Sequence, residues 1–356
     1  MTQNTPLPSY PLNHLHEVRQ RVLSSAQLRA RGVSAAQTAA QCLPGGPWQQ
    51  LLPGVYLLHP EPPTGAERLH GALLYAGRTP APGRRAGSPQ AAAARAGSGY
   101  GAAMVTGLAA LTLYGFGSAP ALMSLRRIDV LVPRTRRLRS TRFVQVLRSA
   151  GLPGAEQVAG MPVAPVERAL ADAVAELTDA AAVRRLLTEA VRGGHSEPAA
   201  VVRELSAAQL LFRAPVADAV DSLLAEGRAV AERRLYGMVR EQGLPDPLWN
   251  VELRLPGGPG LGGVDAYWPD QAVAVVLDTR APRHSPPDAG AREEHDAQWS
   301  AYATGRDHLE GLGITVVHVT PKKLGESPEQ QATVVRTALM AAAGREPAAY
   351  VMVLPR

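Results

Sequence analysis

Two aspartates that lie close together in the sequence have the side-chain type and the spacing to hold a divalent cation. Asp265 lies in VDAYW, and Asp278 follows the apolar run AVAVVL, with PDQ between the two segments. This pattern predicts a strand, a turn and a second strand, so that each arm of a hairpin carries one acid. Hard cations such as Mg²⁺ bind several converging oxygens and can activate water against a phosphodiester. The pair is therefore a candidate metal site.

Val276 lies between these acids in the sequence, two residues before Asp278. Side chains alternate along a strand, so Val276 and Asp278 are expected on one face and Leu277 on the other. Valine offers no ligand oxygen, and its methyl groups fill volume that a hydrated ion needs. Two interpretations stay open: a weak Mg²⁺ site, or a hairpin whose acids are solvated and which needs no cofactor.

The composition bounds the class of protein. The chain has 356 residues, enough for two to three domains of about 100–200 residues each. It is 46% hydrophobic and 19% charged, as in globular proteins. The net charge of +6 favours polyanionic partners. Lys322 and Lys323 are the only lysines among the 37 basic residues. This arginine bias is typical of a GC-rich genome and reduces the weight of the charge.

Cys42 is the single cysteine, which excludes an intrachain disulfide and a thiolate zinc site. The N-terminus lacks the pattern of a signal peptide. Residues 101–123 carry no charge and are long enough to span a bilayer. Glycines and a proline interrupt this stretch, which favours a buried helix followed by a loop. We therefore expect a cytoplasmic protein without a membrane partner.

Two short helices with a tight link between them are predicted near the N-terminus. Serines can cap helices over 26–31 and 35–43, and GVS links them with the spacing of a helix-turn-helix pair. Residues 48–52 and 55–58 predict a hairpin around Pro53-Gly54, where a wing follows such a pair.

The second of these helices is a candidate for reading DNA. A recognition helix contacts bases from its N-terminal half. That half offers Ser34, Gln37, Thr38 and Gln41, and glutamine can pair with adenine edges. The alternative is a helical pair with a structural role only.

Arginines crowd a second predicted hairpin, with strands over 128–132 and 143–147. They are Arg126, Arg127, Arg134, Arg136, Arg137, Arg139, Arg142 and Arg148. Their repulsion is relieved by solvent or by phosphate, and phosphate contacts make DNA affinity depend on salt. We expect Arg134, Arg136, Arg137 and Arg139 to contact DNA phosphates. The alternative is a solvated loop.

The remaining segments predict an alternation of helices and strands. Helices are expected over 67–76, 102–114, 166–177, 180–192, 197–205 and most of 207–241. A mobile, low-complexity loop is expected over 77–101. The C-terminal part reads as helix, strand, hairpin, helix 293–312, strand 315–319 and helix 328–343, which is typical of an α/β sandwich.

Several segments between residues 20 and 190 resemble the AbiEi family of type IV toxin–antitoxin systems. They are SSAQLRARGVSAAQ, WQQLLPGVYLLHP, MVTGLAALTLYGF, IDVLVPRTRRLRS and GMPVAPVERALADAV, in the family's order. The resemblance implies a winged-helix domain that represses its own operon, followed by a domain with antitoxin activity. It implies a cognate toxin as partner, and the sequence leaves open whether one exists.

Residues 230–343 resemble very-short-patch-repair-type endonucleases through AERRLYGMVREQGLPDP, GGVDAYWPDQAVAVVLD and RDHLEGLGITVVHVT. The resemblance implies Glu232, Asp265 and Asp278 as the acids of the site, the two aspartates as metal ligands, and His284 as a base if the site is active. The chain departs from the family at three places. Val276 replaces a glutamate, Thr279 a glycine, and a histidine pair is missing near Pro282-Arg283.

These predictions combine into a multidomain α/β protein. We expect a leader over 1–20, a winged helix-turn-helix over 21–62, an α/β middle domain over 63–229, and a restriction-endonuclease-like α/β sandwich over 230–356. The expected function is that of an antitoxin-type transcriptional regulator that binds double-stranded DNA and has lost nuclease catalysis. A Mg²⁺-dependent DNA endonuclease and a protein-interaction module stay open as alternatives.

Overall fold

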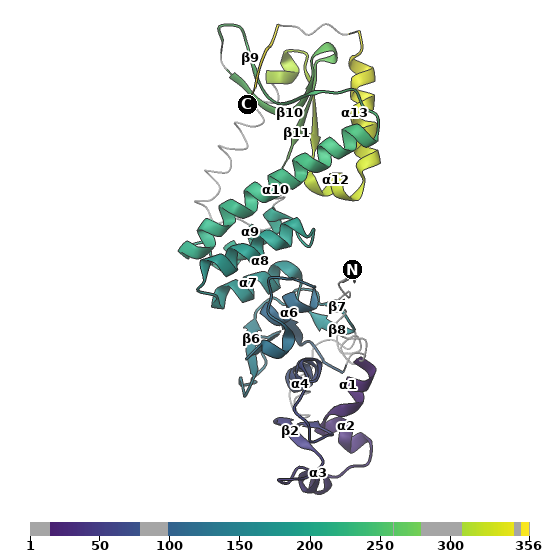
Figure 1. Cartoon of the computed structure of the whole chain (residues 1–356), viewed down its shortest axis with the longest axis vertical. Helices are drawn as coiled ribbons and strands as arrows, with labels where there is room; N and C mark the ends of the chain where they lie inside the picture. The colour runs from purple at the N-terminus through teal and green to yellow at the C-terminus, as the bar shows by residue number, and fades with distance from the viewer. Residues whose placement is uncertain (1–14, 79–98, 259, 279–307, 345–349, 356) are drawn as a thin grey trace, which may run out of the picture. The chain divides into compact units, whose positions relative to one another are not determined.

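The chain forms helices and three β-sheets that group into two units (Figure 1). The computed structural model describes residues 15–78, 99–258, 260–278, 308–344 and 350–355. The first unit comprises residues 1–196 and 201–220, and the second comprises 197–200 and 221–356. The expected mixed α/β, multidomain class is confirmed. The predicted boundary at residue 230 falls inside α10, which runs from Ala214 to Glu241.

The first unit begins with three helices and a small sheet. Its elements are α1 (Leu15–Arg21), β1 (Val22–Ser24), α2 (Ser25–Ala30), α3 (Ala35–Gln41), β2 (Gln49–Leu52) and β3 (Val55–Leu57). The strands are antiparallel in the order β1-β3-β2. Ser24 and Ser34 cap α2 and α3 as predicted, each in a capping box with the glutamine three residues on. Residues 15–20, at the end of the expected leader, form most of α1.

The larger sheet of the first unit has the strand order β6-β5-β4-β8-β7. Its strands are β4 (Met104–Thr106), β5 (Ile128–Pro133), β6 (Val144–Ser149), β7 (Glu156–Val158) and β8 (Met161–Val163). The helices of this part are α4 (Gly65–Gly77), α6 (Gly107–Leu113), the short η1 (Leu122–Ser124), α7 (Val166–Glu176), α8 (Ala180–Arg192) and α9 (Pro198–Ala207). Most of the predicted helices are confirmed, with ends shifted by a few residues.

The predicted arginine-flanked hairpin was wrong, because β5 and β6 pair in parallel, with Val130 opposite Val146. Antiparallel pairing needs a turn at the end of the first strand. Here ten residues, 134–143, connect the strands. At roughly 3.3 Å per residue this connection can run back along the whole of β5.

The predicted helix over 102–114 is shorter than expected, because its first residues form β4. Gly107 has a φ of +63°, and a Cβ there would lie 2.7 Å from Asp129 Oδ2. A positive φ ends the extended strand and lets α6 start in a new direction. Gly107 therefore separates the two elements.

The second unit is a sheet with the order β12-β11-β10-β9-β13. Its strands are β9 (Leu248–Arg254), β10 (Gly260–Trp268), β11 (Val273–Leu277), β12 (Thr315–Val319) and β13 (Met352–Pro355). The 3-10 turn η2 (Pro269–Gln271) joins β10 to β11, and α12 (Pro321–Glu326) and α13 (Pro328–Ala342) follow β12. β11 and β12 are parallel, and the other pairs are antiparallel. Of the predicted helix 293–312, only the end is described.

Apolar side chains of this sheet divide between two clusters. Val275 and Leu277 pack with Leu235 of α10 and Val335 of α13. Val276 packs in another cluster, which holds no residue of α10. This confirms the predicted alternation of side chains along β11.

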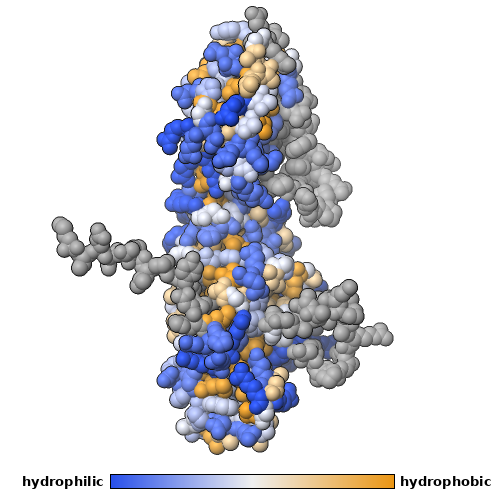
Figure 2. Space-filling view, turned by 90° about the vertical axis from the view of Figure 1, so that its right-hand side faces the viewer, coloured by the Kyte–Doolittle hydropathy of each residue, from blue (hydrophilic) through white to orange (hydrophobic). Residues whose placement is uncertain are grey.

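No helix within the described residues is long and apolar enough to cross a membrane. Residues 101–123, the uncharged stretch, form β4, α6, a turn and η1 instead. Hydrophilic residues cover most of the face drawn in Figure 2, with apolar residues scattered among them.

Candidate functional site

The second of the short helices, α3, presents only part of the polar set predicted to read DNA. Ser34 Oγ accepts a bond from the Gln37 N–H at 3.2 Å, and Gln37 Oε1 accepts one from the Ser34 N–H at 2.8 Å. Thr38 is buried, and its hydroxyl donates to the Ser34 carbonyl at 2.9 Å. The predicted base contact by Thr38 therefore lacks the exposed hydroxyl that it needs. Gln37 and Gln41 are exposed, but Gln41 is the last residue of α3 and so lies outside the N-terminal half where it was expected.

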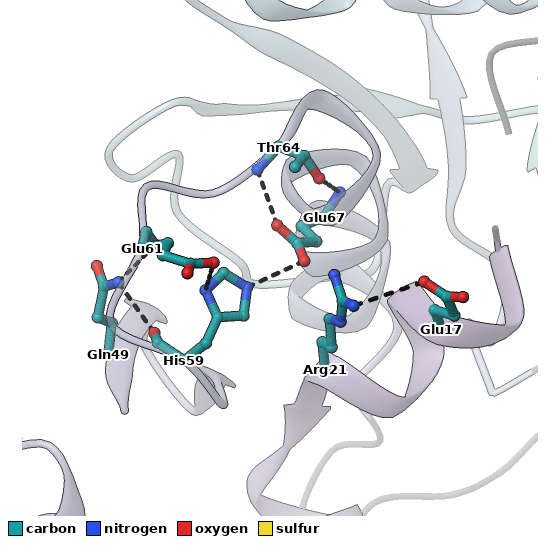
Figure 3. A network of polar contacts seen from close by, with 7 residues as sticks. All are labelled: Glu17, Arg21, Gln49, His59, Glu61, Thr64 and Glu67. Carbon is teal, nitrogen blue, oxygen red and sulfur yellow. Dashed lines mark hydrogen bonds and ion pairs between the residues drawn. The ribbon is translucent and has the colours of Figure 1, made fainter. Parts of the chain in front are cut away.

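Polar contacts tie the β2–β3 hairpin to α4 (Figure 3). Gln49 Nε2 donates to the carbonyls of His59 at 3.0 Å and Glu61 at 2.7 Å. His59 Nε2 lies 3.0 Å from Glu67 Oε1, and Glu67 pairs with Thr64 in the capping box of α4. Burial alone would raise the pKa of Glu67, but hydrogen bonds from Thr64 and His59 hold it below its usual value. The buried carboxylate thus stays charged and fixes the hairpin.

The connection between β5 and β6, residues 134–143, is called the arginine segment below. It contacts the first sheet through Arg142, whose guanidinium donates to the carbonyls of Gln50 at 2.5 Å and Leu51 at 2.8 Å. Arg136 donates to the carbonyl of Ala76 at 2.8 Å and to that of Arg78. Burial, with Arg78 nearby, lowers the pKa of Arg136. Arg136, expected to contact phosphate, instead holds the end of α4.

Two further arginines of the predicted set also have partners inside the protein. Arg148 of β6 donates to the carbonyls of Arg136, at 3.1 Å, and Leu138. Arg127 pairs with Asp129 at 2.9 Å and with Glu176 at 3.5 Å. These side chains already bond to carbonyls or pair with acids inside the protein.

Arg134, Arg137 and Arg139 differ from these four. All three are exposed, and their guanidinium groups have no hydrogen bond or ion pair with any residue in the described ranges. Of the arginines predicted to contact phosphate, these three are presented to solvent.

In the second unit, Asp265 is buried, with a side chain only 4% exposed, and both of its oxygens are occupied. Arg228 of α10 donates to Oδ1 at 2.6 Å, and the Leu277 N–H donates to Oδ2 at 2.7 Å. The backbone ladder between β10 and β11 reaches Ala266 opposite Val275. Beyond that pair, the N–H of Leu277 in β11 donates to the Asp265 carboxylate instead of to a backbone carbonyl of β10.

Arg228 also binds Glu232, one turn further along α10, at 2.9 Å. The structure thus brings together two of the predicted acids, with a guanidinium between them. Asp278 follows β11, and its N–H donates to the Val319 carbonyl at 2.9 Å. Position 276 lies on the sheet face away from α10. His284 and Thr279 fall outside the described residues.

This arrangement does not fit Mg²⁺ as the resemblance implied. Mg²⁺ is bound by several converging oxygens, whereas both Asp265 oxygens are hydrogen-bonded and a guanidinium already lies between Asp265 and Glu232. Within the described ranges, no three His, Cys, Asp or Glu side chains lie close enough together to hold a metal ion. Arg228, which sequence reasoning missed, supplies the positive charge at this position. Its spacing of four residues from Glu232 was the available signal.

A polar network in the larger sheet of the first unit was also missed. Thr106 donates to Asp172 Oδ2 at 2.6 Å, and Arg168 Nε donates to the same atom at 3.0 Å. Asp129 lies nearby on β5, and burial raises its pKa against the opposing effect of Arg127. The network joins β4, β5 and α7. Every acid in it has a basic partner, which is typical of a structural role.

No model of a known protein family matches this sequence, and a search of curated proteins finds no match. The assignment of function therefore rests on the geometry of the two units.

Proposed function

We propose that this chain is a DNA-binding transcriptional regulator of antitoxin type, with a C-terminal unit that does not catalyse DNA cleavage. The observation that carries the proposal is the order α1, β1, α2, α3, β2, β3 with a β1-β3-β2 sheet. A winged helix has this order of elements, and in it the second helix of the helix-turn-helix pair enters the major groove. α3 takes that position, and β2–β3 is the wing.

The chemistry on α3 supports sequence preference rather than strong affinity. Gln41 and Gln37 can offer amide groups to adenine edges, and exposed alanines such as Ala36 and Ala40 can contact thymine methyls. The helix has no arginine. Affinity is therefore expected to come from phosphate contacts elsewhere in the first unit.

The pairing of Asp265 and Glu232 with Arg228 argues against the nuclease alternative. Phosphodiester hydrolysis by such a site requires a metal that activates water. Arg228 holds Asp265 and Glu232 instead, so we propose that the second unit has a structural or partner-binding role. We also propose a cognate toxin as protein partner, on the strength of the AbiEi-like segment order.

Selection of bound fragments from random double-stranded DNA tests the proposal, with the DNA upstream of the chain's own reading frame as a second target. The full chain is expected to enrich one motif. Gln41→Ala is expected to change the preferred base at one or two positions, because each lost bidentate pair removes about 1–3 kcal/mol of discrimination. Gln330→Ala, an exposed glutamine on α13, is the matched control.

Gln37 needs a different substitution, because alanine would also remove the capping box of α3. Gln37→Glu keeps the box and changes only the group offered to DNA. An unchanged motif in both the Gln41 and Gln37 variants would exclude α3 as the recognition helix. Plasmid incubated with the purified chain and Mg²⁺ or Mn²⁺ tests the alternative, since cleavage that Asp265→Ala abolishes would make the chain a nuclease.

A further inference from the structure

We infer that the arginine segment is a phosphate-binding clamp attached to the wing, which lengthens the DNA contact beyond the site read by α3. This inference rests on the proposed DNA binding and adds a second surface to it. It assigns two tasks to the arginines: Arg136, Arg142 and Arg148 position the segment, and Arg134, Arg137 and Arg139 bind phosphates.

The segment is held by bonds at several points along its length. Arg142 binds two carbonyls of β2, and Arg136 binds two carbonyls at the end of α4. Tyr75 of α4 donates to the Arg139 carbonyl at 2.7 Å. Ser140 Oγ accepts from the Val146 N–H at 3.0 Å. A solvated loop needs no such bonds, whereas a binding surface gains affinity when its groups are held in place beforehand.

Holding like charges together is unfavourable unless a partner balances them. The segment presents Arg134, Arg137 and Arg139 without a carboxylate partner among the described residues, and Arg136 and Arg78 add two more charges close by. Guanidinium groups match phosphate oxygens in shape and charge. The partner that this surface fits is a regular polyanion.

The surface continues into the wing. Arg142 binds Gln50 and Leu51 of β2, and Arg78 Nη1 donates to the Pro53 carbonyl in the wing turn at 2.8 Å. The hairpin and the arginine segment thus meet within one unit. DNA that lies along the wing has phosphates on both strands next to it, and this favours DNA over an acidic protein as the occupant.

The slope of log K against log salt measures the number of phosphate contacts. Full-length Arg134→Ala/Arg137→Ala should bind the selected DNA with a slope lower by roughly 1.8, at about 0.9 per lost contact. The slope should fall by the same amount for unrelated DNA. Adding Arg139→Ala should lower the slope by about another 0.9. Arg184→Ala/Arg185→Ala, two exposed arginines on α8, removes the same charge elsewhere and should leave the slope in place.

Hydroxyl-radical footprinting of the same variants locates the contacts. The Arg134/Arg137 double variant should lose protection at one end of the footprint and keep the centre. If its slope and footprint match those of the wild type while Gln41→Ala still changes the motif, the clamp is wrong and the proposed function stands. If the wild type binds no DNA, both are wrong. Equal loss in the α8 variant would mean general charge attraction, and would also overturn the clamp.

Discussion

Arg228 lies one helical turn before Glu232 and reaches Asp265 with another nitrogen of the same guanidinium. The resemblance grouped Glu232, Asp265 and Asp278 in one site, and the structure brings Glu232 and Asp265 together. In the structure Val276 packs on the sheet face away from α10, so the residue type at position 276 matters less here than the arginine that the helix supplies. Arg228 thus places a positive charge between the two acids.

Replacing Arg228 tests this role directly. Arg228→Ala leaves the buried Asp265 without its cation and should lower the free energy of unfolding by about 2–4 kcal/mol, since an unpaired buried charge is costly. Urea titration of the full chain measures the loss. Arg233→Ala, an exposed arginine on the same helix whose side chain is 66% exposed, should change stability by well under 1 kcal/mol. Equal effects in both variants would contradict a special role for Arg228.

The pKa of Glu67 predicts a dependence of stability on pH. Because its pKa is lowered in the folded state, the carboxylate stabilises the fold above the ordinary value of 4.5. This contribution is lost as the pH falls below 4.5 through the folded-state pKa. Glu67→Gln keeps the size of the side chain and should flatten the stability profile between pH 6 and pH 3 relative to wild type. Parallel profiles of the two proteins would mean that Glu67 does not contribute in this way.

Short local signals in the sequence predicted individual helices and hairpins better than they predicted which distant strands pair. Capping serines, the Pro53-Gly54 turn and apolar periodicity located α2, α3, the β2–β3 hairpin and β10–β11. The parallel pairing of β5 with β6 could not be predicted, because it depends on how the chain returns across the sheet. The sequence around β4 is rich in alanine and favours a helix, so β4 was not predicted. The positive φ of Gly107 separates β4 from α6. The pairing of Arg228 with Asp265 spans 37 residues and leaves no pattern in the sequence.

Gly107 offers a test of the boundary between β4 and α6. Gly107→Ala adds both a strained positive φ and a Cβ at 2.7 Å from Asp129 Oδ2. Gly115 also has a positive φ, +87°, but open space around it. Gly115→Ala should therefore cost about 1–2 kcal/mol from strain alone, and Gly107→Ala should cost more. Thermal unfolding of both variants measures the difference, and a smaller loss at Gly107 would refute the close approach of Asp129.

For the whole molecule, the units divide the expected tasks. The first unit holds α3, the β2–β3 hairpin and the exposed arginines, and the second holds the two acids that pair with Arg228. The proposed regulator would therefore bind DNA through the first unit alone and keep its second unit intact without a bound ion.

Chelation checks this independence. Treatment with EDTA should leave both the melting temperature and the DNA affinity of the full chain unchanged, because Arg228 already pairs with both Asp265 and Glu232. In Arg228→Ala, added Mn²⁺ should raise the melting temperature, since the two acids then lack a cation. A fall in the wild-type melting temperature on chelation would show that a metal stabilises the fold.

Arg142 has a further effect that concerns the behaviour of many copies together. β2 is an outer strand of its sheet, and the backbone of such a strand can pair with a strand from another chain. The guanidinium of Arg142 lies on two carbonyls of that strand and brings a positive charge to it. If the β2 strands of two copies approached each other, these carbonyls would already be hydrogen-bonded, and the two Arg142 side chains would repel each other. We therefore expect Arg142, besides holding the arginine segment, to oppose edge-to-edge pairing of the β2–β3 hairpin with a second copy.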